Sequence, residues 1–353
     1  MNTKKRMELY EKLCNLGGVS GHEGDIRSFM KEEIKKHTDE VICDNLGSVF
    51  GVLKGKGPKV MISGHMDEVG AMVVDITPNG FLKMIAIGGI NPEVMVSQNL
   101  LVHANDGKLI PGVCGAIPPH IGGSQTTFDD LQVDIGASSK EEVLEWGINI
   151  GCQITFRNNF YIMNDGYKVV SKAFDDRIGC GVALEVLEKA KNLDHPNTLY
   201  IGGTVQEEVG LRGAQTASNM ISPDLFITID VSPVGDFLGK TNMGKLNGGF
   251  LIRYYDPRCI MNPNLIKYFE DVAKKHNINY QYFKSNGGTD AAIAQYAIPK
   301  GAFSTTVGMP GRYIHSTATI IDVRDLECVC DMVIAIIKTF DESVLERLKN
   351  GEY

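Results

Sequence analysis

Five short clusters of acidic and histidine side chains occur along the sequence, and each falls where we expect a β-strand to end. They read GHMDE around His65, KAFDDRIG around Asp175, TVQEEVG around Glu207, ITIDVSP around Asp230 and GRYIHS around His315. A lone loop histidine is usually a surface residue, and an acidic pair after a strand is usually a helix cap. Open α/β sheets, however, bind ligands beyond their strand ends. The common placement of the clusters therefore predicts one binding site.

Two imidazoles and three carboxylates are a ligand set that zinc accepts. A shared carboxylate would let two divalent ions lie about 3.5 Å apart and activate a water molecule for hydrolysis. We expect zinc, with cobalt or manganese as alternatives for a site so rich in carboxylates. Asp67 follows His65 by two residues at a strand end, so both side chains leave on one face and the carboxylate is expected to orient the imidazole.

Glu207 and Glu208 are adjacent, and in an extended backbone their side chains would point in opposite directions. A turn just before GLRG would let one carboxylate face a metal ion while the other reaches the water molecule. Thr289 and Asp290, in GGTDAA, are expected at the start of a helix. They would either help to bind the substrate through free N–H groups or simply cap that helix.

The elements around these clusters predict an α/β fold with an insert. Before residue 69 and after residue 163, runs such as KVMISGH, TLYIGGTV and LFITIDV alternate with helical patterns. This predicts a three-layer α/β/α sandwich with a mostly parallel central sheet. Residues 69–163 instead show short alternating β segments separated by Gly, Pro and Asn, which favour a small β-barrel-like domain. We therefore expect a catalytic domain formed by residues 1–68 and 164–353, interrupted by an insert at residues 69–163.

Composition excludes several classes of function. A net charge of −8 and a pI near 5.5 argue against nucleic-acid binding, which needs a basic face. No stretch is long and apolar enough for a membrane span, and the first residues lack the pattern of a signal peptide. Eight scattered cysteines without a Cys-x-x-Cys pair indicate reduced thiols. We expect a cytoplasmic protein.

The motifs, taken in order, resemble the dinuclear metallo-aminopeptidase family of the tetrahedral aminopeptidases and glutamyl aminopeptidases, some of whose members have been labelled endoglucanases. The resemblance covers nearly the whole chain through SGHEGDIRSF, DNLGSVFG, GHMDEVG, AFDDRIG, QEEVGLRGA, GGTDAA and PGRYIHS. It implies a metalloprotease that releases N-terminal amino acids from peptides through a water molecule bridging two divalent metal ions. It also implies dimers that build a hollow dodecamer, with the β-rich insert as the assembly domain.

The resemblance assigns a role to each clustered residue. It implies His65 and Asp230 at one metal ion, Glu208 and His315 at the other, Asp175 as the bridge, Glu207 as general base and Asp67 behind His65. The family pattern places the metal carboxylate first in the Asp-Asp pair, so Asp176 is a candidate for a supporting position. His120 matches a family segment without a derivable role. Residues 244–250, GKLNGGF, depart from a Gly-x-Gly-Pro turn of relatives, so side-chain preference is left open.

Three alternatives stand beside this reading. An N-acyl amino acid amidohydrolase or carboxypeptidase of the same metal class would carry its extra domain after the glutamate pair, whereas this insert precedes FDDR. An endoglucanase would need two facing carboxylates and commonly an aromatic sugar platform, and the chain has one Trp. A non-catalytic peptide-binding protein would be expected to lose metal ligands first, and every expected ligand is present.

Overall fold

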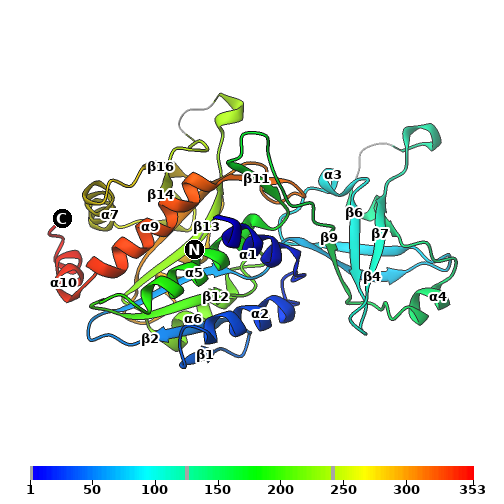
Figure 1. The fold of residues 1–353 in the computed structure, drawn as a ribbon. Helices are drawn as coiled ribbons and strands as arrows, with labels where there is room; N and C mark the ends of the chain where they lie inside the picture. The colour runs from blue at the N-terminus through cyan, green and yellow to red at the C-terminus, as the bar shows by residue number, and fades with distance from the viewer. Residues whose placement is uncertain (1–2, 124–126, 240–242) are drawn as a thin grey trace.

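The computed structural model describes residues 3–123, 127–239 and 243–353 (Figure 1). Its centre is a nine-stranded sheet in which four adjacent strands run parallel. In spatial order these are β12 (Thr198–Thr204), β3 (Lys59–His65), β13 (Leu225–Pro233) and β17 (Phe303–Gly311).

The strands on either side of this parallel centre make the sheet mixed. β2 (Val49–Leu53) pairs antiparallel with β12 and carries β1 (Val41–Cys43) at its outer edge. On the other side β14 (Phe250–Asp256) pairs antiparallel with β17, and β15 (Cys259–Ile260) and β16 (Tyr280–Lys284) both pair with β14. The predicted parallel order therefore holds for the middle of the sheet and not for its edges.

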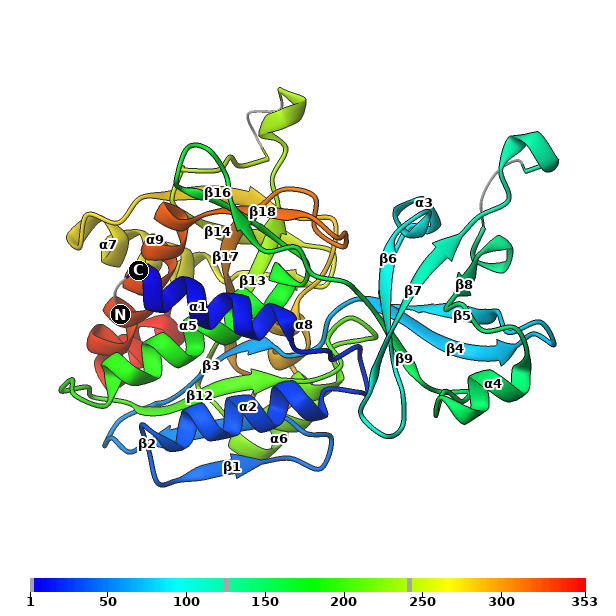
Figure 2. The same cartoon turned by 45° about the vertical axis from the view of Figure 1, so that its right-hand side comes forward.

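Helices cover both faces of the sheet, which confirms the three predicted layers (Figures 1 and 2). One face carries α2 (Gly24–Lys35), α5 (Phe174–Ala190), α7 (Pro263–Lys275) and α9 (Val323–Thr339), with α1 (Thr3–Asn15) packed on α5 and α10 (Glu342–Asn350) contributing to the same core. The other face carries α6 (Arg212–Ile221) and α8 (Asp290–Ala294). None of the helices in the described ranges is long and apolar enough to cross a lipid bilayer.

The local sequence explains the elements closest to the strand ends. In β13 every residue except the last is buried, as expected for a strand covered by helices on both faces. In α2 the apolar residues Ile26, Phe29, Met30 and Ile34 recur at helical spacing and are the buried ones. Helix α5 is buried on nearly every side, because it lies between the sheet and α1.

A close backbone contact joins β3 to the first turn of α5. A Cβ atom on Gly64 would lie 2.3 Å from the carbonyl carbon of Gly179, which is far inside van der Waals contact. Gly179 has the same restriction, because a Cβ there would lie 2.6 Å from the carbonyl oxygen of Ile229. Glycine at both positions lets the helix start directly against the ends of β3 and β13. The consequence is that residues at the end of β3 and at the start of α5 become neighbours.

A second, separate core belongs to a closed antiparallel barrel, seen beside the sandwich in Figures 1 and 2. Its strands in spatial order are β4 (Gly70–Ile76), β5 (Leu82–Ile87), β8 (Gln132–Asp134), β7 (Leu109–Gly115), β6 (Asn99–His103) and β9 (Gln153–Phe156). The short helices α3 (Pro92–Met95) and α4 (Lys140–Glu145) lie in its connections. The predicted β-barrel-like insert is thus present as a barrel.

A small three-stranded sheet lies where the chain returns from the barrel. β10 (Tyr161–Ile162) pairs with β11 (Lys168–Ser171), which pairs with β18 (Thr319–Asp322). β10 belongs to the predicted insert by residue number, although its partner lies outside it. The division of the chain at residues 68 and 163 stays a prediction.

Candidate metal centre

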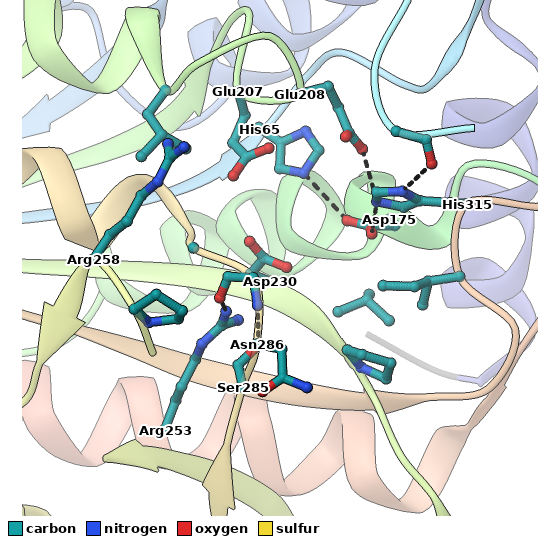
Figure 3. A pocket seen from close by; sticks show the side chains of 18 of the residues that line it. His65, Asp175, Glu207, Glu208, Asp230, Arg253, Arg258, Ser285, Asn286 and His315 are labelled. Atoms are coloured by element: carbon teal, nitrogen blue, oxygen red, sulfur yellow. Dashed lines mark hydrogen bonds and ion pairs between the residues drawn. The ribbon is translucent and has the colours of Figure 1, made fainter. Parts of the chain in front are cut away.

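The five predicted clusters meet in one pocket of about 690 Å³ at the carboxyl ends of the parallel strands (Figure 3). The side chains come from five places in the fold: His65 ends β3, Asp175 lies in the first turn of α5, Glu207 and Glu208 follow β12, Asp230 lies in β13, and His315 follows β17. Ligands of open α/β sheets bind at this edge.

Asp175 lies between the two histidines. Its Oδ1 atom is 3.2 Å from Nε2 of His65, and its Oδ2 atom is 3.4 Å from Nε2 of His315. Figure 3 shows the carboxylate between the two rings. Burial opposes its ionisation, but hydrogen bonds with His315 and His65 hold the pKa of Asp175 well below its usual range. A carboxylate whose two oxygens face two different imidazoles has the geometry to be shared by two cations.

Two groups of candidate ligand atoms share this carboxylate. His65, Asp175 and Asp230 form one group, and Asp175, Glu208 and His315 form the other, with the ligand atoms of each group all within 4.8 Å of one another. Nε2 of His315 is also 3.4 Å from Oε1 of Glu208. Its Nδ1 lies 2.8 Å from the carbonyl oxygen of Gly89, a contact that orients the ring toward the centre.

Negative charge accumulates in the pocket. Burial raises the pKa of Asp230 to about 7 and the pKa of Glu208 to about 8, and the nearby charge of Asp175 adds to both shifts. Buried carboxylates are costly unless a cation compensates them. The donor set and its charge therefore fit divalent metal ions.

Asp67 lies behind His65 and does not belong to either group of ligand atoms. Its Oδ1 atom is 3.4 Å from Nδ1 of His65, and the same carboxylate accepts hydrogen bonds from the backbone N–H groups of Glu207 and Glu208, at 2.9 and 3.1 Å. Burial would raise its pKa, but the bonds with His65 and Ser20 lower it. Asp67 therefore connects the histidine to the loop that carries both glutamates.

Glu207 lines the pocket, and Figure 3 shows its carboxylate beside His65. This carboxylate has no hydrogen bond or ion pair with any residue that the structure describes. Burial raises its pKa well above the usual value, while the nearby His65 acts in the opposite direction. Glu207 is therefore available to a bound molecule in a way that Asp67 is not.

Asp176, the second residue of the Asp-Asp pair, points away from the pocket. It accepts hydrogen bonds from the backbone N–H groups of His65, at 3.0 Å, and Gly179, at 2.9 Å. Its carboxylate thus ties the end of β3 to the first turn of α5. This is the supporting position considered for it in the sequence, and it leaves Asp175 to face the histidines.

The remaining predicted positions lie outside the pocket lining. Thr289 and Asp290 are buried, and their side chains bond to Thr306, at 2.8 Å, and Thr204, at 2.5 Å. Their contact with substrate stays a prediction. His120 is exposed in a short 3₁₀ turn after β7.

Residues 244–250, the segment that differs from the Gly-x-Gly-Pro turn of relatives, are held by Asp325 at the start of α9. The carboxylate of Asp325 accepts hydrogen bonds from the backbone N–H groups of Asn247 and Gly249, at 2.6 and 2.7 Å. Met243, just before this segment, lines the pocket.

The sequence patterns did not reveal the cationic residues of the pocket, nor the residues that support the loop carrying Glu207 and Glu208. Arg253 and Arg258 line the pocket, and Ser20 and Glu23 contact Asp67 and Gln206. Ser20 and Glu23 stand in the quoted SGHEG motif, which was the only available signal. Nothing in RYYDPRC distinguishes a pocket arginine from a surface one.

Comparisons with known proteins agree with this geometry. The model of the M42 glutamyl aminopeptidase family matches residues 47–332. Over 98% of this chain and 100% of the relative, the sequence is 36% identical to a glutamyl aminopeptidase of Lactococcus lactis. It is 35% identical to a lysyl aminopeptidase of Pyrococcus furiosus, over 94% of this chain and 96% of the relative.

Solved structures extend the likeness to the whole fold. A TET aminopeptidase from a marine sediment archaeon of the Thaumarchaeota superposes with a TM-score of 0.94 at 35% identity, covering 99% of this chain and 100% of the other. The TET1 peptidase of Pyrococcus horikoshii, described as assembling into a tetrahedron or a large octahedral shell, gives a TM-score of 0.87 at 29% identity, covering 95% and 100%.

Proposed function

The chain belongs to the M42 glutamyl aminopeptidase family, and on that premise we propose that it is a metal-dependent aminopeptidase that releases N-terminal amino acids from peptides. The observation that carries the proposal is the position of Asp175, whose two oxygens face His65 and His315 separately. Two divalent ions, with zinc expected, would then be held by His65 and Asp230 on one side, Glu208 and His315 on the other, and Asp175 between them.

When bound, the two ions would polarise the scissile carbonyl and lower the pKa of the attacking water molecule. The chain's own residues supply the remaining steps. Glu207 accepts the proton of that water on its carboxylate and passes it to the nitrogen of the leaving amine. Asp67 contacts Nδ1 of His65 and accepts a hydrogen bond from the Glu207 N–H. It therefore fixes the position of the base relative to one ligand.

Peptide hydrolysis with and without metal tests this function. The purified protein should release free amino acids from the N-terminus of short peptides, lose that activity after chelation, and recover it when zinc, cobalt or manganese is added. A peptide whose N-terminus is blocked, such as an N-acetyl peptide, serves as control and should not be cleaved. Hydrolysis that survives complete removal of the metal, or release of residues from the C-terminus only, would contradict the proposal.

The positively charged residues that line the pocket bear on which N-terminal side chain a substrate should carry. Arg253, Arg258 and Lys284 line the pocket. Arg253 is buried and engaged, with Nε 3.3 Å from Asp256, whereas the exposed Arg258 guanidinium has no ion pair or hydrogen bond with any described residue. Figure 3 shows Arg258 on the side of the pocket away from His315.

A free guanidinium beside the centre would bind a carboxylate through charge-assisted hydrogen bonds and repel an ammonium group. The two relatives named for glutamyl and lysyl substrates are almost equally similar to this chain, so identity does not decide between them. We therefore propose a preference for an acidic N-terminal residue, with Arg258 as the residue that selects it.

Glutamyl, leucyl and lysyl p-nitroanilides test this preference through kcat/KM. The wild type should prefer the glutamyl substrate, and Arg258→Glu should lower the glutamyl-to-leucyl ratio by about tenfold to a hundredfold while raising the lysyl rate. Lys31→Glu, which makes the same charge change on an exposed position of α2, should leave the ratio unchanged. A wild-type preference for lysine, or a ratio insensitive to Arg258→Glu, would reject the acidic preference without affecting the aminopeptidase proposal.

We also propose that the protein self-associates, as a dimer or dodecamer, through its barrel. Ile85, Leu109 and Val113 are apolar residues of β5 and β7 that are 44%, 51% and 46% exposed. Apolar side chains exposed on two strands of one small barrel favour an interaction surface there. Peptides of the cytoplasm are the expected substrates, and neither nucleic acid nor a membrane is an expected partner.

A further inference from the structure

The loop that carries Glu207 and Glu208 is neither helix nor strand, so its shape depends on what its backbone groups bind. On one side it is held by the start of α6. The carbonyl oxygens of Val205 and Gln206 accept hydrogen bonds from the N–H groups of Gly213 and Arg212, at 2.9 and 3.2 Å. Gln206 has a positive φ of 54°, which turns the chain just before the two glutamates.

On its other side the loop presents three successive N–H groups to two carboxylates. The N–H of Gln206 donates to Oε1 of Glu23, at 3.1 Å. The N–H groups of Glu207 and Glu208 donate to Oδ1 and Oδ2 of Asp67, at 2.9 and 3.1 Å. Glu23 and Asp67 therefore hold the N–H groups of two successive residues, Gln206 and Glu207.

The turn between α1 and α2 supplies Glu23 directly and holds the Asp67 carboxylate, which itself follows β3, through Ser20. Ser20 donates from Oγ to Oδ2 of Asp67, at 2.6 Å, and Glu23 stands three residues later at the start of α2. The turn is itself fastened to the end of β3, because the N–H of Glu68 donates to the carbonyl oxygen of Gly18, at 2.9 Å. The turn that carries Glu23 is therefore bonded to the segment directly after the strand that carries His65.

The stability of α2 does not explain the Glu23 carboxylate. Glu23 occupies the N-cap position, but its side chain makes no capping hydrogen bond to that helix. It is only 5% exposed, and burial raises its pKa, while the backbone N–H groups of Gly21, of Glu23 itself and of Gln206 act against that shift. Burying a carboxyl group is costly, and among the N–H groups that face this one, Gln206 is the group that belongs to the loop with the two glutamates.

We propose that Glu23 is a positioning residue for peptide hydrolysis, holding the Gln206 backbone so that the Glu207 carboxylate faces the attacking water. Ser20 supports the same loop through Asp67. The inference rests on the proposed role of Glu207 as general base. A displacement of about 1 Å at a reacting group lowers rates by as much as 10²-fold, so a lost anchor next to the base is expected to lower kcat.

Two substitutions of Glu23 separate the anchor from the charge. Glu23→Ala removes the acceptor of the Gln206 N–H, and kcat should fall about tenfold or more. KM and metal content should stay unchanged, because Asp67 and the candidate ligands are untouched. Glu23→Gln keeps a carbonyl oxygen at the same place and should retain kcat within about twofold of the wild type. Ser20→Ala should give a smaller loss, since Asp67 keeps both N–H donors of the loop.

A matched control and a double-mutant cycle exclude a general loss of structure. Asp341→Ala also deletes a carboxylate that accepts a backbone N–H, from Val344 at the start of α10, and should lower thermal stability without changing kcat. In a Glu207→Gln background, Glu23→Ala should cause little further loss, because the group that Glu23 positions is already gone.

The outcomes separate the inference from the proposed function. Loss of kcat in Glu23→Ala, recovery in Glu23→Gln and non-additivity with Glu207→Gln would support the positioning role. Unchanged kcat in Glu23→Ala, equal losses in the Ala and Gln variants, or fully additive losses would overturn it. If Glu207→Gln itself kept normal turnover, the assignment of the base would fail first, before any test of Glu23.

Discussion

The two adjacent glutamates differ in the surroundings of their carboxylates. Glu208 lies 3.4 Å from Nε2 of His315 and shares a group of ligand atoms with Asp175. Glu207 has a buried carboxylate without a bonded partner among the described residues. The turn at Gln206 brings both side chains to the pocket, although neighbours in a strand would point apart. Both glutamates also share a group of candidate ligand atoms with His65, so the contacts of Glu208 with Asp175 and His315 are what favour Glu208 as the ligand and leave Glu207 as the base.

Conservative replacement of each glutamate tests this division. Glu207→Gln keeps size and shape but cannot accept and return a proton, so kcat should fall by roughly 10²-fold or more while metal content stays at the wild-type value. Glu208→Gln should lose metal as well as rate. Steady-state kinetics and metal analysis of the same preparations provide the measurement. Equal loss of metal in both variants would mean that the roles have been divided wrongly.

At this scale the sequence predicted which residues meet but not what surrounds them. The five clusters were recognisable because each combines a chemically distinctive residue with a strand end. The hydrogen bond from Gln206 to Glu23 joins positions 183 residues apart, so no local sequence pattern predicts it. The position of Arg258 in the pocket could not be predicted either, because it depends on how β14 and β15 pack beside β17.

Among the elements, the contact between β3 and α5 matters most for the centre. It brings the end of β3, with His65, against the turn that carries Asp175, and it requires glycine at positions 64 and 179. Strand and helix positions were predictable from apolar runs and helical spacing. The antiparallel edges were not, because a short buried strand such as β14 has the same residue pattern in either direction.

Gly64→Ala should destabilise the fold, since its Cβ would lie 2.3 Å from the backbone of Gly179. We expect a loss of about 3 kcal/mol in the free energy of unfolding, measured by urea denaturation. Metal affinity should fall with it, because the two elements that carry His65 and Asp175 would separate. Gly24→Ala is the matched control: a Cβ there meets nothing within 4 Å, and stability should be unchanged or slightly higher. Equal stability of the two variants would show that the contact is not tight.

The whole molecule joins a catalytic sandwich to a barrel that has its own core and contributes none of the candidate ligands. Gly89, which orients His315, nevertheless comes from the segment after β5, so a connection of the barrel reaches the centre. None of the eight cysteines is paired in a disulfide. The composition of residues 69–163 predicted a separate β module, but its partner surface is not encoded in any local pattern.

Sedimentation velocity at micromolar concentration tests self-association. The 38.6 kDa chain should sediment as a dimer or as a larger closed assembly. Leu109→Asp, which places a charge among the exposed apolar residues of the barrel, should shift the distribution toward the monomer while leaving the circular dichroism spectrum unchanged. A wild-type protein that sediments only as a monomer would contradict the assembly proposal and would leave the exposed barrel residues unexplained.

If two cations share Asp175, the ratio of metal ions to subunits will show it. After loading with zinc and dialysis, elemental analysis of the wild type should give a ratio of two. His65→Ala and His315→Ala should each fall toward one, because each removes a ligand from a single site. Asp175→Asn should fall below either histidine variant, because it weakens both sites at once. A saturated wild type that holds a single ion, or an Asp175→Asn variant that still holds two, would contradict the account.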